Sequence, residues 1–196
     1  MKALQHIKIL LASASPRRKE LIAGLGLPYE IVKIDVDEVF DAKLQAQEIP
    51  LYLAALKANA VDVNILNDNE VVLTADTVVW VNNQVLNKPV DKADALRMLQ
   101  LLNGNTHQVF TAVSMRTRTK SINFYDATTV HFNTLSVAEL EHYLDTYQPY
   151  DKAGAYGIQE WIGYTAIQKI EGDFFNVMGL PISLVYKNLK LIFEVQ

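Results

Sequence analysis

The feature that most constrains the fold is the run VVLTADTVVW at residues 71–80. It is apolar and rich in β-branched side chains along almost its whole length, which is the pattern of a strand buried on both faces. It is the clearest strand signal in the chain. We therefore expect a strand there that is buried on both faces.

Asp76 interrupts this apolar run. A carboxylate inside a buried strand is costly unless it is paired, bound to a metal or facing a cleft. A simpler interpretation is a strand end or bulge that carries the aspartate. Because unpaired buried aspartates are rare, we favour a functional role for Asp76.

A second constraint lies at residues 7–22, with the sequence IKILLASASPRRKELI. Its apolar beginning predicts a strand, and Ser15 and Pro16 are typical of a helix start. A helix start presents unpaired N–H groups and the positive end of the helix dipole, so Ser13, Arg17 and Arg18 favour an anion site there, most naturally for phosphate. Taken alone, the same residues also fit an ordinary capped helix with solvated arginines, and that interpretation leads at this point.

Strands and helices alternate along the rest of the chain. Besides 7–12 and 71–80, we expect strands at 29–34, 84–86, 107–116, 121–132 and 162–170, and a short extended piece at 174–178. We expect helices at 16–25, from Pro50 onward, and at 91–102, 136–147 and 182–193. This order predicts the α/β class with a mixed sheet. Since repeats, linkers and low-complexity segments are absent from the sequence, residues 1–196 are expected to form a single domain.

Composition excludes several classes of protein. The net charge of −4 argues weakly against a protein that coats a nucleic acid polymer, although it permits a local basic pocket for one nucleotide. The chain has no cysteine, which removes disulfides and thiolate chemistry. It has neither a signal-peptide pattern nor an apolar stretch long enough to cross a bilayer. We expect a soluble, cytoplasmic protein without a membrane partner.

Several motifs of common enzymes are also absent. The four histidines are far apart and lack metal-ligand spacing, and the sequence has no Walker A loop, no G-x-G-x-x-G after a strand and no G-x-S-x-G. The remaining polar side chains are arginines, lysines and carboxylates. They suit metal-assisted chemistry on a phosphate ester or anhydride.

Three further features bear on such a site. Lys57 lies one residue from the apolar stripe of its helix, so it is either a surface lysine, which is the default, or a side chain that reaches into a cleft. Lys88 precedes Pro89 and is held extended in a loop. The segment DKAGAYGIQ at 151–159 is a glycine-containing loop of a kind that often approaches a ligand closely.

Six stretches together resemble the Maf family of nucleoside triphosphate pyrophosphatases. They are SASPRR at 13–18, ADT at 75–77, KP at 88–89, NGNTH at 103–107, DKAGAYGIQ at 151–159 and GLP at 179–181. The resemblance implies a two-lobed α/β fold, in which helices flank a bent mixed sheet with a central cleft, akin to inosine triphosphate pyrophosphatase. It also implies hydrolysis of a nucleoside triphosphate to the monophosphate and diphosphate, as part of house-cleaning nucleotide metabolism. A homodimer is the oligomeric state that it suggests.

The resemblance assigns roles to individual residues. Asp76 matches the catalytic proton acceptor, and Glu38 matches an acidic position that helps with metal or water, so the two would hold a divalent cation, Mg²⁺ or Mn²⁺. The positions that match phosphate-holding residues are Ser13, Arg17, Arg18, Lys57 and Lys88.

Three positions concern the choice of base. Arg17, Thr77 and Gln159 match the subgroup of the family that acts on dTTP and UTP rather than on 7-methyl-GTP. The chain departs from the family pattern at two places. Glu160-Trp161 stands where a glycine often follows Gln159, which could alter the base pocket, and Asn87 precedes Lys88 where glycine is frequent. The alternatives are a non-catalytic nucleotide-binding regulator and a pyrophosphatase for 7-methyl-GTP or other modified nucleotides.

Overall fold

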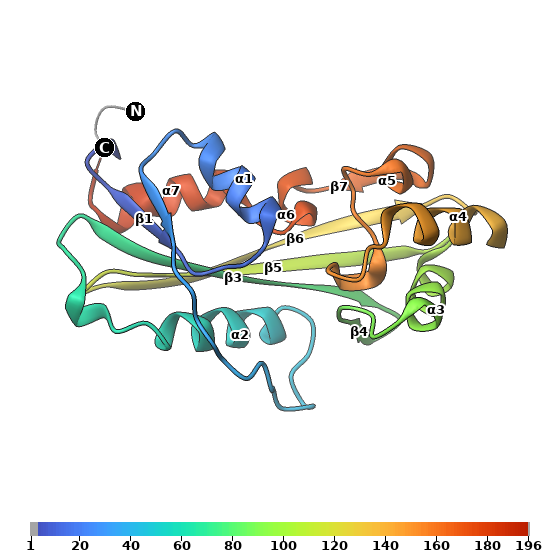
Figure 1. The fold of residues 1–196 in the computed structure, drawn as a ribbon, viewed down its shortest axis with the longest axis horizontal. Coiled ribbons are helices and arrows are strands. Elements are labelled where there is room, and N and C mark those ends of the chain that lie inside the picture. The colour runs from blue at the N-terminus through green and yellow to red at the C-terminus, as the bar shows by residue number, and fades with distance from the viewer. Residues whose placement is uncertain (1–3, 196) are drawn as a thin grey trace.

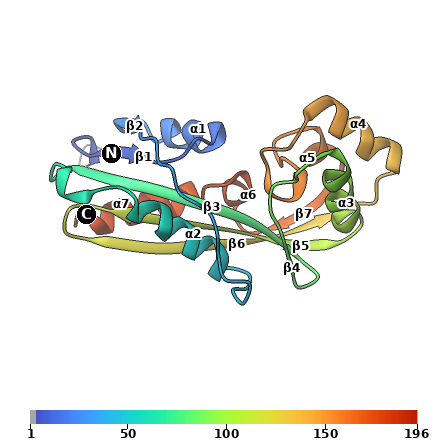
Figure 2. The same ribbon diagram turned by 60° about the horizontal axis from the view of Figure 1, so that its bottom comes forward.

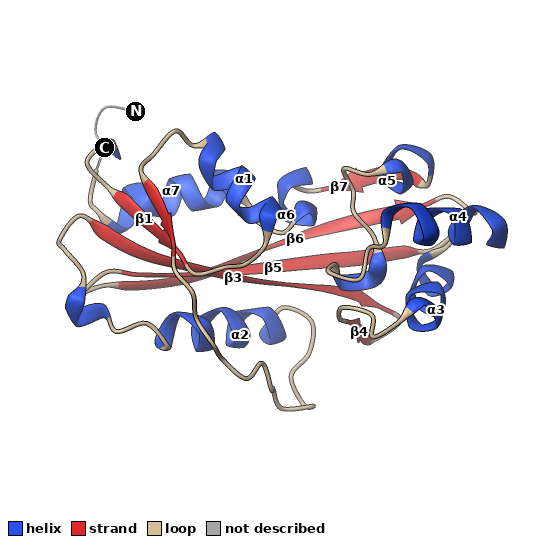
Figure 3. Cartoon of the chain, viewed as in Figure 1, coloured by secondary structure: helices blue, strands red, loops and turns tan. Residues whose placement is uncertain are grey.

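The computed structural model describes residues 4–195, so residues 1–3 and 196 of the predicted domain lie outside the described residues. A seven-stranded sheet forms its centre (Figures 1 and 3). The strands are β1 (Lys8–Leu11), β2 (Tyr29–Ile31), β3 (Glu70–Val81), β4 (Gln84–Leu86), β5 (Thr106–Arg116), β6 (Ser121–Phe132) and β7 (Ile167–Glu171). The helices are α1 (Pro16–Gly24), α2 (Glu48–Asn59), α3 (Lys92–Leu102), α4 (Val137–Tyr147), α5 (Trp161–Thr165), α6 (Phe174–Met178) and α7 (Ile182–Ile192), with 3₁₀ turns at Val63–Ile65 and Ala153–Ala155.

The sheet is mixed, as predicted. Its order is β2-β1-β3-β5-β6-β7, with β4 beside β3, and β1 is parallel to both of its neighbours whereas the other pairs are antiparallel. The run at 71–80 is the middle of β3, and all of its residues except Thr77 and Trp80 are buried. The prediction of a strand buried on both faces is confirmed.

One edge of β3 is open at its centre. On this edge β1 pairs with residues 70–73 and β4 pairs with residues 79–81, while β5 pairs along the other edge. Within residues 4–195, positions 74–78 therefore have no strand partner on this side. The chain leaves β1 and β4 at this gap, so the loops that follow these strands, at 12–15 and 87–91, meet there.

Helices cover both faces of the sheet. Figure 1 shows α2 alone on one face and α1, α6 and α7 on the other, while α3, α4 and α5 gather with β4 and β7 at the far end of the long strands. The view in Figure 2 shows the same division into two lobes joined by β3, β5 and β6. The predicted α/β class with a two-lobed arrangement is confirmed.

The alternation of side chains along β3 places its apolar residues in separate clusters on the two faces of the sheet. Val78 faces α2, where it packs with Ile49, Leu53 and Phe110 in a small cluster. Val79 points to the opposite face and belongs to the main core. The period of two in a strand sends neighbouring residues to opposite faces, so Asp76 lies on the α2 face and Thr77 on the other.

Two predicted elements are wrong. Residues 162–170 do not form one strand, because β6 ends at Phe132, opposite Ile167, and residues before this position have no neighbouring strand to pair with. They form α5 instead. The extended piece at 174–178 is the helix α6, with Asp173 accepting a hydrogen bond from the Phe175 amide at its start and Gly179 in the left-handed conformation at its end.

Among the described residues, every helix is too short or too polar to cross a membrane.

Candidate active site

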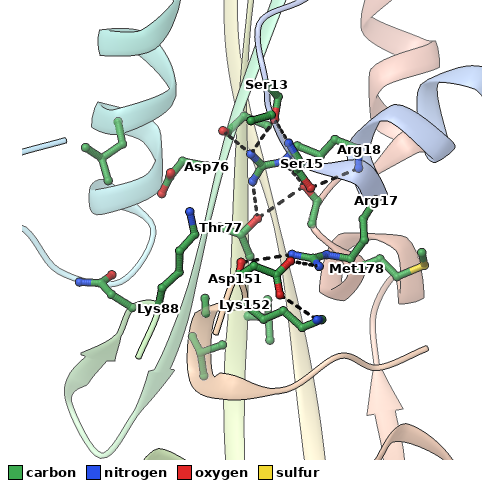
Figure 4. A pocket seen from close by; sticks show the side chains of 18 of the residues that line it. Ser13, Ser15, Arg17, Arg18, Asp76, Thr77, Lys88, Asp151, Lys152 and Met178 are labelled. Atoms are coloured by element: carbon green, nitrogen blue, oxygen red, sulfur yellow. Dashed lines mark hydrogen bonds and ion pairs between the residues drawn. The ribbon is translucent and has the colours of Figure 1, made fainter. Parts of the chain in front are cut away.

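A cavity of about 570 Å³ opens at the unpaired edge of β3. Its walls come from the loop after β1, the start of α1, α2, the loop after β4, the segment 151–157 and the end of α6 (Figure 4). The volume is in the range that small-molecule sites occupy. The basic side chains that line it are Arg17, Arg18, Lys57, Lys88 and Lys152, and the acidic ones are Glu38, Asp76 and Asp151. The excess of basic groups suits an anionic ligand.

The structure brings almost all of the predicted site residues to this cavity. Those that line it are Ser13, Arg17, Arg18, Glu38, Lys57, Asp76, Thr77 and Lys88. Gln159 is the exception, because it lines a second, smaller pocket beside α5 and β7, and its buried side-chain oxygen has no partner among the described residues. Its predicted role in base selection stays a prediction.

Asp76, Lys57 and Glu38 form a compact charged cluster on the α2 face of β3. The Lys57 ammonium lies 2.6 Å from Asp76 Oδ1 and 2.9 Å from Glu38 Oε2. Asp76 and Lys57 are buried, with 8% and 9% of their surface exposed, whereas the Glu38 side chain is half exposed. Lys57 is therefore no surface lysine: it reaches over the edge of α2 into the cleft and joins the two carboxylates.

The environment of Asp76 favours a proton-accepting carboxylate. Burial raises the pKa of Asp76 above its ordinary value, while the charges of Lys57 and Arg18 oppose that rise. A carboxylate whose pKa lies closer to neutrality is a better general base. Figure 4 shows the Lys88 side chain, from the loop after β4, extending towards Asp76.

Arg18 lies on the other face of β3, where its hydrogen bonds connect separate segments of the cavity wall. Its guanidinium donates to the Ala75 carbonyl at 2.9 Å, the Gly179 carbonyl at 2.8 Å and the Thr77 hydroxyl at 3.0 Å, with a longer bond of 3.4 Å to Ser13. It thus occupies the open edge of β3 in place of a neighbouring strand. Burial lowers the pKa of the Arg18 guanidinium, although an arginine stays protonated.

Thr77 is held within this framework. Its hydroxyl accepts a hydrogen bond from Arg18 and lies 2.9 Å from the Thr111 hydroxyl, which in turn donates to the Asn176 carbonyl. The Thr77 proton is therefore directed to Thr111. The Thr77 hydroxyl can therefore only accept a hydrogen bond from a ligand, through its remaining lone pair.

Arg17, the neighbour of Arg18, is held differently. Its Nη1 lies 2.7 Å from Asp151 Oδ2, and the other oxygen of Asp151 lies 2.8 Å from the Lys152 ammonium. Burial alone would raise the pKa of Asp151, but the hydrogen bonds from Lys152 and Arg17 hold it below its ordinary value. The sequence identified the segment 151–159 as a ligand-approaching loop but did not single out Asp151 or Lys152. The sequence signal that could have identified Asp151 and Lys152 is a pair of charged residues directly before the small residues at 153–155.

Ser13 lies in the short loop between the end of β1 and the start of α1. Its hydroxyl oxygen accepts a hydrogen bond from the Ser15 amide at 3.3 Å, while Ser15 caps α1 by accepting from the Arg18 amide. The predicted capped helix start is confirmed, and it lines the cavity. The hydroxyl proton of Ser13 remains available for a ligand oxygen.

The residues present fit a divalent cation that is shared with a substrate. Among residues 4–195, no group of three or more histidine, cysteine, aspartate or glutamate side chains could enclose a metal on its own. Asp76 and Glu38 each contact the Lys57 ammonium through one oxygen, which leaves their second oxygens for such an ion. Mg²⁺ is commonly bound by one or two carboxylates together with substrate phosphates.

A family model described as Maf-like protein matches residues 8–192. The chain belongs to the Maf family. Among similar curated proteins are three that are each named dTTP/UTP pyrophosphatase. One from Porphyromonas gingivalis is 49% identical and covers 95% of each chain, and one from Bacteroides thetaiotaomicron is 48% identical and covers 95% of this chain and 97% of its own. One from Flavobacterium johnsoniae is 46% identical over 95% of each chain.

The Maf match spans both lobes and all of the elements that line the cavity. The predicted family is therefore confirmed over the whole of the site, including the segment 151–159.

Proposed function

We propose that this Maf protein is a nucleoside triphosphate pyrophosphatase that hydrolyses dTTP and UTP to the monophosphate and diphosphate. The observation that carries the proposal is the cluster of Asp76, Lys57 and Glu38 on the wall of a predominantly basic cavity. The names of the similar proteins support the same reaction and the same bases.

The charges of the cavity suit a triphosphate. Attack by water on the α phosphorus adds negative charge to the departing diphosphate, and positive groups fixed beforehand in a closed cleft stabilise such charge. Lys88 and Lys57 contribute ammonium groups to the lining of the cavity, and the hydroxyl of Ser13 contributes a donor before the start of α1. Arg18 contributes a fixed charge, because most of its donors are bonded to the protein.

Asp76 is the group we assign to accept a proton from the attacking water. Its burial raises its affinity for a proton, and Lys57 orients its carboxylate from 2.6 Å away. Glu38 shares Lys57 and holds the ammonium in place. A Mg²⁺ or Mn²⁺ ion bound by Asp76 and Glu38 would supply charge neutralisation of the phosphates.

The choice of base falls to Arg17 in this proposal. A guanidinium only donates hydrogen bonds, so it favours the carbonyl at position 4 of uracil and thymine over the amino group of cytosine. Its bond to Asp151 fixes one side of the guanidinium and leaves the others for a ligand. Gln159 would assist only if the turn at 157–160 presents it to the cavity.

A substrate panel tests the proposal. Release of diphosphate is measured with dTTP, UTP, CTP and 7-methyl-GTP, each with and without Mg²⁺ or Mn²⁺. We expect dTTP and UTP to have the highest kcat/KM. Tight binding without release of diphosphate would instead support a non-catalytic regulator, and a preference for 7-methyl-GTP would support the modified-nucleotide alternative. A cytoplasmic location and a homodimer stay predictions.

A further inference from the structure

A continuous chain of polar contacts runs from the interior of the α3–α4–α5 lobe to the cavity. Its members are Tyr143 of α4, Glu160, Lys152, Asp151 and Arg17. The last three line the cavity, whereas Tyr143 and Glu160 lie behind it. Glu160 is one of the positions that depart from the family pattern, so its place in this chain gives the departure a structural meaning.

Glu160 uses both of its carboxylate oxygens. Oε1 lies 3.0 Å from the Lys152 ammonium, and Oε2 accepts a hydrogen bond from the Tyr143 hydroxyl. Burial and the adjacent carboxylate raise the pKa of Tyr143, so the tyrosine remains the donor. Glu160 is thereby fixed between a fully buried tyrosine and a lysine that is 8% exposed.

The Lys152 ammonium forms ion pairs with two carboxylates. It lies 2.8 Å from Asp151 Oδ1 and 3.0 Å from Glu160 Oε1. A buried ammonium requires anionic partners, so loss of the charge on Glu160 would draw Asp151 towards Lys152. Asp151 would then hold Arg17 less firmly, because the same carboxylate carries the 2.7 Å contact with its guanidinium.

Glu160 also fixes the turn that carries Gln159. The Glu160 amide donates to the Gly157 carbonyl at 3.0 Å, and the Gly157 amide donates to the Tyr143 hydroxyl at 3.0 Å. The carboxylate packs directly on Gly157, where an added Cβ would lie 2.7 Å from the Glu160 carboxyl carbon. A single side chain thus connects the turn at 157–160 with the guanidinium of Arg17.

We propose that Glu160 is a positioning residue for base selection, which holds Arg17 in its selective geometry through Lys152 and Asp151. The inference rests on the proposed function, because it concerns the base of the nucleotide bound in the same cavity. Glu160 does not touch the ligand in this account. It acts by setting where the donors of Arg17 point.

The test compares selectivity rather than activity alone. Binding of the non-hydrolysable α,β-methylene analogues of UTP and CTP is measured by calorimetry for the wild type, Glu160→Gln, Arg17→Ala and the double variant. We expect Glu160→Gln to lower the preference for the UTP analogue about three- to tenfold, as for a coupling between contacting groups. In the Arg17→Ala background the same substitution should have no further effect on the preference.

Two more variants exclude a general loss of structure. Glu141→Gln removes an exposed carboxylate from the same helix as Tyr143 and should leave the preference unchanged. Tyr143→Phe keeps the ring packing but releases Oε2 of Glu160, and should lower the preference in the same direction by a smaller factor. It provides the test if Glu160→Gln does not fold.

The outcomes separate this inference from the reaction. An unchanged preference in Glu160→Gln, or equal losses with and without Arg17, would overturn the inference. A wild type that prefers the UTP analogue but releases no diphosphate from dTTP or UTP would overturn the proposed reaction. The positioning role would then still be judged on binding alone.

Discussion

The two faces of β3 have different roles at the adjacent residues Asp76 and Thr77. On the α2 face, Asp76 is bound to the side chain of Lys57, which is itself shared with Glu38. On the opposite face, Thr77 belongs to a framework in which Arg18 is bonded to the backbone carbonyls of two separate segments. Side-chain partners can exchange for water or phosphate, whereas backbone partners cannot move without unfolding the site. We therefore assign chemistry to the first face and architecture to the second.

The two arginines of α1 make the same contrast on a smaller scale. Arg18 connects β3 with the end of α6, while Arg17 is bonded to the Asp151 carboxylate and retains donors towards the cavity. In the sequence they are adjacent residues at the start of one helix. Their different partners predict that substitutions will separate stability from selectivity.

The largest effect is expected on the α2 face. Asp76→Asn should lower kcat/KM for release of diphosphate from dTTP by about a thousandfold, the order of a lost general base. The fold should survive, since the amide keeps the size of the side chain and Lys57 retains Glu38. The loss of kcat/KM is measured by diphosphate release, and the retained fold is measured by circular dichroism. Near-normal turnover would remove Asp76 from the mechanism.

Arg18→Met tests the framework face. Loss of the guanidinium leaves the Ala75 and Gly179 carbonyls without their donor, and we expect the free energy of unfolding in urea to fall by about 2 kcal/mol. Activity on every nucleotide should fall by a similar factor, because the cavity wall loosens as a whole. A stable variant whose ranking of bases changes would contradict the assignment.

Arg17→Ala should have the opposite profile. We expect the ratio of kcat/KM for UTP to that for CTP to fall about tenfold, which corresponds to about 1.4 kcal/mol. The free energy of unfolding should change by less than about 1 kcal/mol, as for other ion pairs that are partly exposed to solvent. Equal loss on UTP and CTP would show that Arg17 contacts phosphate rather than base.

The smallest effect concerns pH. The acid limb of kcat/KM should lie above the ordinary carboxyl pKa of about 4, because burial raises the pKa of Asp76 in the free enzyme. The sign for stability follows from the same shift. The folded state holds this proton more tightly than the unfolded chain, so the contribution of Asp76 to stability is greatest at low pH and is lost as pH rises through its folded pKa.

Two measurements check the raised pKa of Asp76. The first is the pH profile of kcat/KM, in which an acid limb at or below pH 4 would contradict the raised pKa. The second is urea unfolding of the wild type and Asp76→Asn at several pH values, in which the variant is expected to gain stability relative to the wild type as pH increases.

The sequence was sufficient where a pattern had one physical interpretation. The apolar run at 71–80 favoured a buried strand, and the helix expected at 136–147 is present as α4, with a capping box formed by Ser136 and Glu139. It was insufficient where the pairing of distant segments decided the outcome. Residues 162–165 resemble a strand by composition, but they lie beyond the end of β6 and become helical. For α6, the flanking Asp173 and Gly179 were cap signals that the apolar content concealed.

The same limit applies to the site. The resemblance identified Asp76, Lys57 and Lys88, and the fold brings them to one cavity. It singled out Arg17 for the choice of base, but it could not show that Arg18 is bonded to backbone carbonyls, because these partners come from residues 75 and 179, far away in the chain. Nor could it reveal the contact between Glu160 and Lys152, which depends on how the loop at 151–160 folds back on α4.

The most direct test of the division between the two faces is the binding of UTP and CTP to Asp76→Asn in the presence of Mg²⁺, followed by calorimetry. The account predicts that this variant binds UTP in preference to CTP as the wild type selects them, while it releases almost no diphosphate. Loss of the preference together with turnover would show that chemistry and base selection are not separated across β3.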